Sequence, residues 1–290
     1  MLNRCNSDTD SRHTGFRMSE SLDERRQRLY AVLYSRPEQN ALSGVFFYFE
    51  VGFMAEFWNQ IQDNLFFLLV CVAIIAGLSL IAKLSERFLP AVRKTAPARR
   101  ITIVAVCSAV AAVLHMLDFP LLFLAPEFYK LDFSELPVML CGFYLGPSAA
   151  VICEALKILI KLLLKGTSTA FVGDFANFAV GCSLVLPAVI VYHTKKSRAS
   201  AIWGLVLGTL FLTVFGSAFN AIYLLPKFSE LYGIPLDSII AMGSAINGGI
   251  HSVSTFVLLA VAPLNLIKGV AVSLLTLLLY KRVARPLFGN

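Results

Sequence analysis

Residues 130–181 read KLDFSELPVMLCGFYLGPSAAVICEALKILIKLLLKGTSTAFVGDFANFAVG, a mostly apolar stretch that carries polar side chains at intervals. Burying such groups in hydrocarbon is costly, so each one needs a polar partner, water or a function. The step Leu145-Gly146-Pro147 interrupts the apolar run without adding charge. It predicts a tight turn between two short membrane spans, or a broken helix that lines a cavity. The polar residues of the stretch are Asp132, Glu135, Glu154, Lys157, Asp174 and Asn177.

The whole chain is too apolar for a water-soluble domain, since 57% of its 290 residues are hydrophobic and only 15% are charged. Several apolar runs approach the roughly 20 residues that a membrane helix needs. We therefore expect an all-α polytopic membrane protein, in contact with the lipid bilayer. The net charge of +7 does not indicate nucleic-acid binding, because the basic residues cluster at the ends of apolar runs.

The apolar runs divide the chain into four predicted segments. Residues 1–64 are polar and mixed in charge, which predicts a largely disordered extension. Residues 65–82 predict an extra transmembrane helix, and residues 83–100 a basic cytoplasmic linker. Residues 101–285 form the main membrane domain. Its six predicted spans are 101–117, 136–145, 147–164, 171–192, 201–225 and 264–280, and the piece 253–262 lies in or dips into the membrane.

The distribution of basic residues predicts the orientation of these spans. Basic loops fall at 83–100, 193–200 and 281–285, and the loops between them are acidic or sparsely charged. Cytoplasmic loops carry the excess of lysine and arginine. Both ends of the six-span domain, and therefore the C-terminus, are expected in the cytoplasm of a cell that holds this protein in its plasma membrane.

Motifs for catalysis and metal binding are missing from the sequence. There is no G-x-x-x-x-G-K-[ST] loop for ATP, no H-E-x-x-H and no G-x-S-x-G. The four histidines are scattered, and the six cysteines show no C-x-x-C spacing. We therefore expect no catalytic residue, no metal and no cofactor, and a role in recognition rather than in an enzymatic reaction.

Two groups of buried polar residues have different interpretations. Glu154 and Lys157 lie three apart on one helix, so they are expected to form a structural ion pair. Asn177 lies between Gly173 and Gly181 at spacings of four, which favours an interhelical hydrogen bond or a ligand contact. A second group lies near the outer ends of its spans, where amides, a phenol and an ammonium form the polar lining of a small-molecule site. That group is Asn220, Tyr223, Asn265 and Lys268.

A stripe of small residues runs along the first span of the main domain. Ala105 and Ala109 are four apart, and so are Ser108 and Ala112. Small residues at this spacing allow another helix backbone to approach closely. The stripe serves packing within the chain or docking to another subunit, and its spacing does not distinguish the two.

Six motifs follow one another in a fixed order along the main domain. They are LDFSELP at 131–137, GFYLGP at 142–147, Glu154-x-x-Lys157, GTSTAFVGDFANF at 166–178, Asn220-Ala221-x-x-x-Leu225-Pro226 and APLNLxKG at 262–269. Over roughly residues 101–285, this ordered set resembles the riboflavin-specific substrate-binding (S) component of energy-coupling factor transporters. The resemblance implies a six-helix S-component bundle, to which residues 65–82 add one N-terminal helix.

The resemblance implies a protein that binds riboflavin as a transported substrate from outside the cell. Its partners would be a membrane coupling subunit and two cytoplasmic ATPases, with Ala105 and Ala109 as docking residues. The family's flavin contacts map onto Leu145, Gly146, Pro147, Asn220, Asn265 and Lys268, with Asp132 and Phe133 as weaker candidates. A single lysine also favours riboflavin over its phosphorylated forms, because a phosphate calls for more than one cation.

Two alternatives remain at this point. The same architecture could serve another vitamin or a flavin analogue, although the motif set argues against another vitamin. A polytopic membrane enzyme or scaffold is the alternative from another class. It would use Glu154, Lys157 and Asp174, and it predicts that these three side chains lie next to one another.

Overall fold

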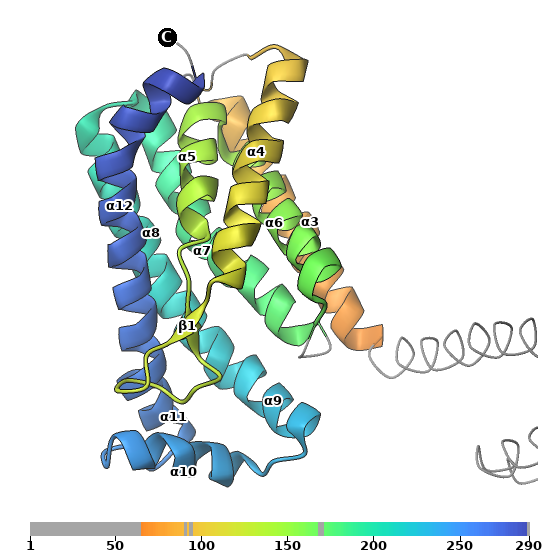
Figure 1. Cartoon of the computed structure of the whole chain (residues 1–290), viewed down its shortest axis with the longest axis vertical. Coiled ribbons are helices and arrows are strands. Elements are labelled where there is room, and N and C mark those ends of the chain that lie inside the picture. The colour runs from red at the N-terminus through yellow and green to blue at the C-terminus, as the bar shows by residue number, and fades with distance from the viewer. Residues whose placement is uncertain (1–64, 90–91, 93–94, 168–170, 289–290) are drawn as a thin grey trace, which may run out of the picture. The chain divides into compact units, whose positions relative to one another are not determined.

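The computed structural model describes residues 65–89, 92, 95–167 and 171–288 (Figure 1). The predicted extension 1–64 lies outside the described residues. The chain from Phe67 onward forms one compact unit, which holds all the features described below.

The unit is a helical bundle, as the sequence predicts, and it also contains one small β-hairpin, which the sequence does not predict. Six bundle helices follow residue 95, and α3 precedes them. Their bounds are α3 Leu65–Phe88, α4 Pro97–Met116, α5 Glu135–Leu145, α6 Pro147–Lys165, α7 Val172–Lys195, α8 Arg198–Phe219 and α12 Ala262–Phe288.

Five helical stretches of the described part are long and apolar enough to cross a membrane by themselves. They are Leu69–Phe88, Pro97–Met116, Val172–Lys195, Arg198–Glu230 and Val253–Tyr280. The two remaining bundle helices fall short for different reasons. Helix α5 has only 11 residues, and α6 carries four charged side chains: Glu154, Lys157, Lys161 and Lys165. Helix α5 is buried by its neighbours at almost every position, and α6 is buried on one face only, so neither has to face lipid on all sides.

Two helical stretches continue past the predicted span boundaries at 225 and 264, and each contains a proline next to that boundary, Pro226 or Pro263. After α8 the chain continues through the π-helical segment η1, Asn220–Leu224, into α9, Leu225–Tyr232. The short helix α11, Val253–Phe256, likewise continues through the π-helical segment η2, Val257–Val261, into α12. The expectation that 253–262 is a separate piece before a span beginning at Leu264 is therefore wrong. Each proline follows a π segment by two residues, and the wider turn accommodates its missing N–H and its ring.

The side chains of the bundle pack into a continuous apolar interior at the end where α5 meets α6. Phe143 stacks on Tyr192 with ring centroids 4.3 Å apart, and the Tyr192 and Tyr280 hydroxyls are hydrogen bonded at 2.9 Å. This cluster draws on α4, α5, α6, α7, α8 and α12. We call this the Gly146 end of the bundle; it is the upper end in Figure 1.

The opposite end carries a cap made of short elements. Strands β1, Phe119–Pro120, and β2, Lys130–Leu131, pair antiparallel, with Phe119 opposite Leu131. Helices α9, α10 (Leu236–Ile246) and α11 lie at the same end in Figure 1. Phe256, Ile250 and Leu225 are fully buried there and form a separate apolar cluster. The cap therefore has its own core.

The outward faces of the long helices are apolar. On α8, Trp203, Phe211 and Val214 are more than half exposed, and on α12 Leu274 and Leu278 are exposed in the same way. Exposed apolar faces of this extent are expected where lipid is the solvent. Helix α7 differs, because none of its large apolar side chains is exposed.

Helix α3 packs on α6 and contacts the turn between α5 and α6. Cys71 and Ala82 are buried in a cluster with Val151 and Ile158 of α6. At the end of α3, the Glu86 carboxylate accepts a hydrogen bond of 2.8 Å from the Ser148 backbone N–H, in the first turn of α6. A carboxylate at this position satisfies a donor that the helix itself leaves unpaired, and it also interacts favourably with the helix dipole.

Candidate binding site

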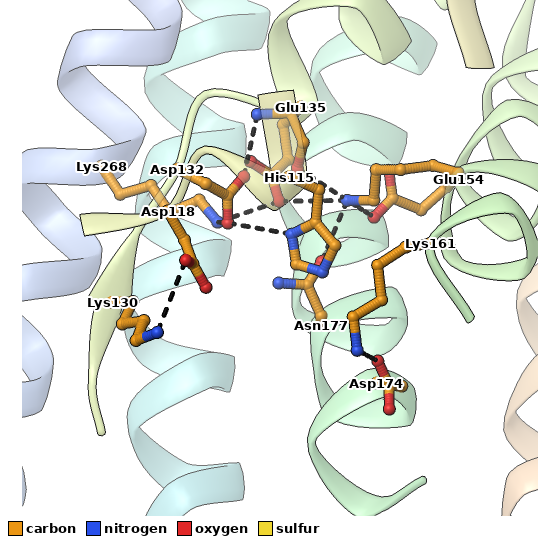
Figure 2. A network of polar contacts seen from close by, with 12 residues as sticks. His115, Asp118, Lys130, Asp132, Glu135, Glu154, Lys161, Asp174, Asn177 and Lys268 are labelled. Atoms are coloured by element: carbon orange, nitrogen blue, oxygen red, sulfur yellow. Dashed lines mark hydrogen bonds and ion pairs between the residues drawn. The ribbon is translucent and has the colours of Figure 1, made fainter. Parts of the chain in front are cut away.

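A buried cluster of charged side chains joins α5, α6 and α12 to the loop that precedes α5 (Figure 2). The Lys268 ammonium of α12 donates to Glu135 Oε1 at 3.0 Å and to Asp132 Oδ2 at 3.3 Å. Asp132 and Glu135 are 2% and 1% exposed, and Lys268 is 9% exposed. Segments 133 or more residues apart in the sequence are thus joined by these two contacts.

Lys157 of α6 lies at the centre of the same cluster and is fully buried. Its ammonium contacts Glu154 Oε1 at 2.5 Å and Glu135 Oε1 at 3.4 Å. It also donates to Ser134 Oγ and to the Asn177 amide oxygen, each at 3.0 Å. The expected Glu154–Lys157 pair is therefore present, but it belongs to a larger network. We name the set Asp132, Glu135, Glu154, Lys157 and Lys268 the ionic cluster.

The ionic cluster contains three carboxylates and two ammonium groups. Within the described residues, Glu135 Oε2 and Glu154 Oε2 are buried without a hydrogen-bond partner. Buried side chains keep their charges only when they are paired with opposite charges, because removing a charge from water is costly. The helix α7 makes room for the cluster at Gly181, where a Cβ atom would collide with the Glu154 carboxylate.

Asp132 connects the ionic cluster to α4. Its Oδ2 atom lies 3.3 Å from His115 Nδ1 as well as 3.3 Å from the Lys268 ammonium. Its Oδ1 atom accepts a 2.8 Å hydrogen bond from the Ser134 backbone N–H, just before α5 begins. Burial alone would raise the pKa of Asp132, but Lys268 and the hydrogen bond with His115 hold that pKa well below its usual range. The carboxyl group is therefore ionised at neutral pH.

We expect the Asp132→Asn variant to be less stable than the wild type at neutral pH, by about 1–3 kcal/mol. Because the pKa of Asp132 is lowered in the folded protein, its stabilising effect is complete above the unfolded-state value of about 3.9. The effect is lost only as the pH falls through the lowered folded-state pKa, so the difference between the two proteins should shrink in strong acid. Thermal unfolding in detergent at several pH values measures this.

Asp118→Asn is the matched control, since Asp118 pairs with Lys130 at 3.5 Å in a more exposed place. Exposed pairs contribute little, so this variant should change the stability by less than about 1 kcal/mol. Equal stability of Asp132→Asn and the wild type at pH 7 would contradict a structural role of the Asp132 charge.

Two asparagine amides lie on either side of Gly216 near the ionic cluster. Asn220, at the start of η1, donates to the Gly216 carbonyl at 2.7 Å and accepts from the Tyr129 hydroxyl at 2.7 Å. Asn265 Nδ2 is the atom nearest to a Cβ built on Gly216, at 2.7 Å. Among the described residues this Asn265 nitrogen has no hydrogen-bond partner, although the side chain is only 8% exposed. Asn265 and Lys268 lie three apart on α12, so they share one helix face.

Tyr129 fixes the orientation of the Asn220 amide. Burial raises the pKa of the Tyr129 phenol far above its usual value, so the hydroxyl stays protonated and acts as the donor. Its acceptor is the Asn220 amide oxygen, which leaves the amide nitrogen to Gly216. The Tyr129 ring also lies 6.0 Å from that of Phe256 in the cap.

The structure does not bring Leu145, Gly146 and Pro147 to this site. Glu135 at the start of α5 contacts Lys268, whereas Leu145 ends the same helix. Ten helical residues separate the two by about 15 Å along the axis. Gly146 instead faces Glu86 of α3 at the Gly146 end, in a left-handed conformation with φ 112° that suits glycine. The sequence motif marks a turn here, and the turn lies at the far end of the bundle.

Three other predicted site residues have partners of their own within the bundle, the hairpin or the ionic cluster. The Asn177 amide oxygen is engaged by Lys157. The Tyr223 ring stacks on Phe219 with centroids 5.3 Å apart and packs against the cluster that joins α3, α6 and α7. Phe133 is half-buried and lies 6.1 Å from Phe119 of the hairpin, beside Asp132. Of the three, only Phe133 adjoins the ionic cluster in sequence.

Ala105 and Ala109 lie on the exposed face of α4. The alternate small pair, Ser108 and Ala112, is buried, and Ser108 donates to the Val104 and Cys153 carbonyls. The two stripes of small residues thus have different uses. One packs α4 against α6 within the chain, and the other leaves a flat surface open.

Glu135, His115 and Tyr129 were not predicted as site residues. The one signal for Glu135 was an acidic residue at the start of an apolar helix. The positions of His115 and Tyr129 gave no signal, because they reach the site only through the packing of α4 and the hairpin. In the described part of the chain, no group of three or more His, Cys, Asp or Glu side chains could hold a metal ion.

Comparisons with known proteins match the same part of the chain. Residues 99–280 match the family described as ECF transporter, substrate-specific component. The riboflavin transporter RibU of Staphylococcus aureus is 35% identical over 186 residues, which cover 64% of this chain and 90% of that protein. The riboflavin transporter FmnP of Bacillus subtilis is 28% identical over 183 residues, covering 63% and 90%.

A solved structure described as the S component of a bacterial ECF transporter also matches, with a TM-score of 0.52 and 35% identity. The match covers 66% of this chain and 98% of that one. These findings confirm the resemblance drawn from the motifs and the predicted S-component bundle. Helix α3 lies outside the residues matched to the family.

Proposed function

This chain belongs to the family of substrate-specific components of ECF transporters, and we propose that it is a riboflavin-binding subunit. The observation that carries the proposal is that Asn220 and Asn265 lie next to Gly216 while Lys268 of the ionic cluster lies one helical turn from Asn265. The relatives from Staphylococcus aureus and Bacillus subtilis are both named riboflavin transporters, which supports the choice of ligand.

The chemistry of these side chains suits the edge of a flavin. Isoalloxazine has flat apolar faces and an edge of carbonyl and ring-nitrogen acceptors. The unpaired Asn265 nitrogen and the Lys268 ammonium are donors that can meet such acceptors. The aromatic ring of Tyr129, whose hydroxyl donates to Asn220, can cover an apolar face. A few convergent polar groups in apolar surroundings are the usual composition of a small-molecule site.

The proposed site consists of Asn220, Asn265 and Lys268, with Asp132 and Phe133 at its edge. Leu145, Gly146 and Pro147 are left out of it because they lie at the Gly146 end. Asn177 is assigned to the support of Lys157, and Tyr223 to the packing around η1.

We infer the sidedness from the basic residues. Arg87, Arg99, Arg100, Lys195 and Arg198 all lie at the ends of helices that meet at the Gly146 end. The positive-inside rule assigns this end, with the C-terminus, to the cytoplasm of a cell whose plasma membrane holds the protein. The site by Lys268 then faces outside, and riboflavin enters from there.

Transport requires an energy source that this chain does not carry, since the sequence has no P-loop. We propose that α4 docks on a membrane coupling subunit through Ala105 and Ala109, and that two cytoplasmic ATPases drive the complex. The chain itself has no catalytic role in this proposal. Asp174 pairs with Lys161 at 2.5 Å, one helical turn from Lys157, rather than with the Glu154–Lys157 pair that a membrane enzyme would use.

Purification of the full chain in detergent, without added riboflavin, tests the ligand directly. We expect a flavin absorbance in the purified protein, or quenching of riboflavin fluorescence with submicromolar affinity. Riboflavin phosphate is the comparator, and it should bind much more weakly because the ionic cluster has one more carboxylate than ammonium groups. A well-folded protein that binds neither compound would contradict the proposed substrate and leave the family assignment intact. Equal affinity for the two compounds would contradict only the discrimination against phosphate.

A further inference from the structure

Two carboxylates of the ionic cluster contact the Lys268 ammonium, one from a loop and one from a helix. Asp132 belongs to the loop before α5 and shares its Oδ2 atom between Lys268 and His115. Glu135 is the first residue of α5 and lies closer to the ammonium, at 3.0 Å. Figure 2 shows both carboxylates directed at Lys268. Glu135 stands at the start of a helix whose residues are almost all buried in the bundle, and its backbone is therefore fixed by that packing.

We propose that Glu135 is the positioning residue for Lys268, which aims the ammonium at the acceptor edge of riboflavin. This inference rests on the proposed function, and it adds a residue that neither the motifs nor the comparisons assign to the site. Glu135 does not have to touch riboflavin to act in this way. It fixes where the Lys268 charge lies on α12, and it supplies much of the compensating negative charge.

Lys157 contacts Glu135 as well and fixes the position of its carboxylate. The same Glu135 Oε1 atom accepts from Lys268 at 3.0 Å and from Lys157 at 3.4 Å. Lys157 in turn is fixed by Glu154 on its own helix and by Asn177 on α7. All of these groups except Asn177 are at least nine-tenths buried, so water does not screen the charges. A line of fixed charges therefore runs from α6 through Glu135 to Lys268, and Asn177 of α7 supports it with a neutral amide.

Removing the charge at position 135 has a definite consequence in this geometry. Two ammonium groups that shared one carboxylate oxygen would face each other with only a neutral amide between them. Lys268 would then be drawn toward Asp132, its other carboxylate partner. The ammonium would still be present, but it would be displaced from the position in which Asn265 and Lys268 act together on one helix face.

The balance of charge also limits the chemistry of the ligand. Lys268 already has two carboxylates within 3.3 Å, so its charge is compensated before any ligand arrives. A neutral acceptor can take a hydrogen bond from such an ammonium without bringing further negative charge into the site. An anionic group would meet Asp132 and Glu135 as well and would be repelled. The ligand group that meets Lys268 is therefore a neutral carbonyl or ring nitrogen.

A double-mutant cycle distinguishes positioning from general structural support. Riboflavin dissociation constants are measured by fluorescence quenching for the wild type, Glu135→Gln, Lys268→Ala and the double variant. Glu135→Gln keeps the size of the side chain and removes its charge. We expect it to weaken binding by about tenfold in the wild-type background, as for a hydrogen bond to a charged group. In the Lys268→Ala background the same change should cost less than about twofold, because its target is gone.

The Asn265→Ala background is the matched control. Asn265 does not contact Glu135 through any interaction in the described structure, so Glu135→Gln should still weaken binding about tenfold there. Should glutamine at 135 prevent folding, Glu135→Asp takes its place in the same cycle with the same expected pattern, since it shortens the reach of the carboxylate by one methylene.

Equal losses in the wild-type and Lys268→Ala backgrounds would contradict the positioning role, and so would unchanged affinity of Glu135→Gln. In either case a wild type that binds riboflavin leaves the proposed function standing. A folded wild type that does not bind riboflavin would contradict the proposed function, and the inference with it. The three results are thus distinguishable from the same set of titrations.

Discussion

Replacing Lys268 by alanine is expected to weaken riboflavin binding by about 10- to 150-fold, or 1.5–3 kcal/mol. The variant removes a charged donor from the proposed site and leaves Asp132 and Glu135 without one of their partners. The two carboxylates then repel each other in a place that is 2% exposed or less. Part of the effect will therefore be a loss of stability, which a thermal unfolding measurement in the same detergent reports separately.

Lys161→Ala is the control for this variant. Its ammonium also forms an ion pair in the bundle, with Asp174 at 2.5 Å, and it donates to the Gly166 carbonyl. It is not connected to Lys268 by any contact in the described structure, so it should lower stability while leaving the riboflavin affinity within about twofold. An unchanged affinity of Lys268→Ala, in a folded protein, would place the binding site elsewhere.

The helices could be predicted from the sequence because the apolar runs report burial in lipid. The boundaries at Pro226 and Pro263 could not, since a proline normally ends a helix or kinks it. In this chain a π segment precedes each of the two prolines and absorbs the strain. A π turn has no clear signature in a single sequence. The first of these segments begins with Asn220, which places an irregular turn at the proposed site, as is frequent for π-helical turns.

The site was only partly predictable, for a related reason. Helical spacing correctly paired Glu154 with Lys157 and put Asn265 on the same face as Lys268, because residues three apart on a helix are neighbours. It could not bring Glu135 to Lys268 across 133 residues of sequence, since that contact depends on how α5 and α12 pack. The motif at 145–147 correctly predicted a turn, but it did not predict at which end of the bundle the turn lies. The position of the turn follows from the direction of α5, since this helix begins at Glu135 in the ionic cluster and ends at Leu145, far from it.

Replacing both Ala105 and Ala109 by leucine is expected to abolish riboflavin transport in cells, while binding by the purified chain stays within about twofold of the wild type. Both alanines are exposed on α4, on the side away from Ser108 and Cys107, which pack inside the bundle. Leucine side chains there would hold a partner helix several ångströms further away and remove the close backbone approach that small residues permit. Uptake of labelled riboflavin and titration of the purified protein measure the two quantities.

The same double change at Ala73 and Ala76 separates docking from a general effect of bulk. These alanines are also exposed and lie three apart, but on α3, outside the residues matched to the family. Transport should survive there, because added leucines on a surface that faces only lipid are well tolerated. Loss of binding in the Ala105 and Ala109 variant would mean that these residues support the fold, which their exposure argues against. Loss of transport in both variants would mean that α3 takes part in coupling too, and the contact of Glu86 with the first turn of α6 would then be the place to examine.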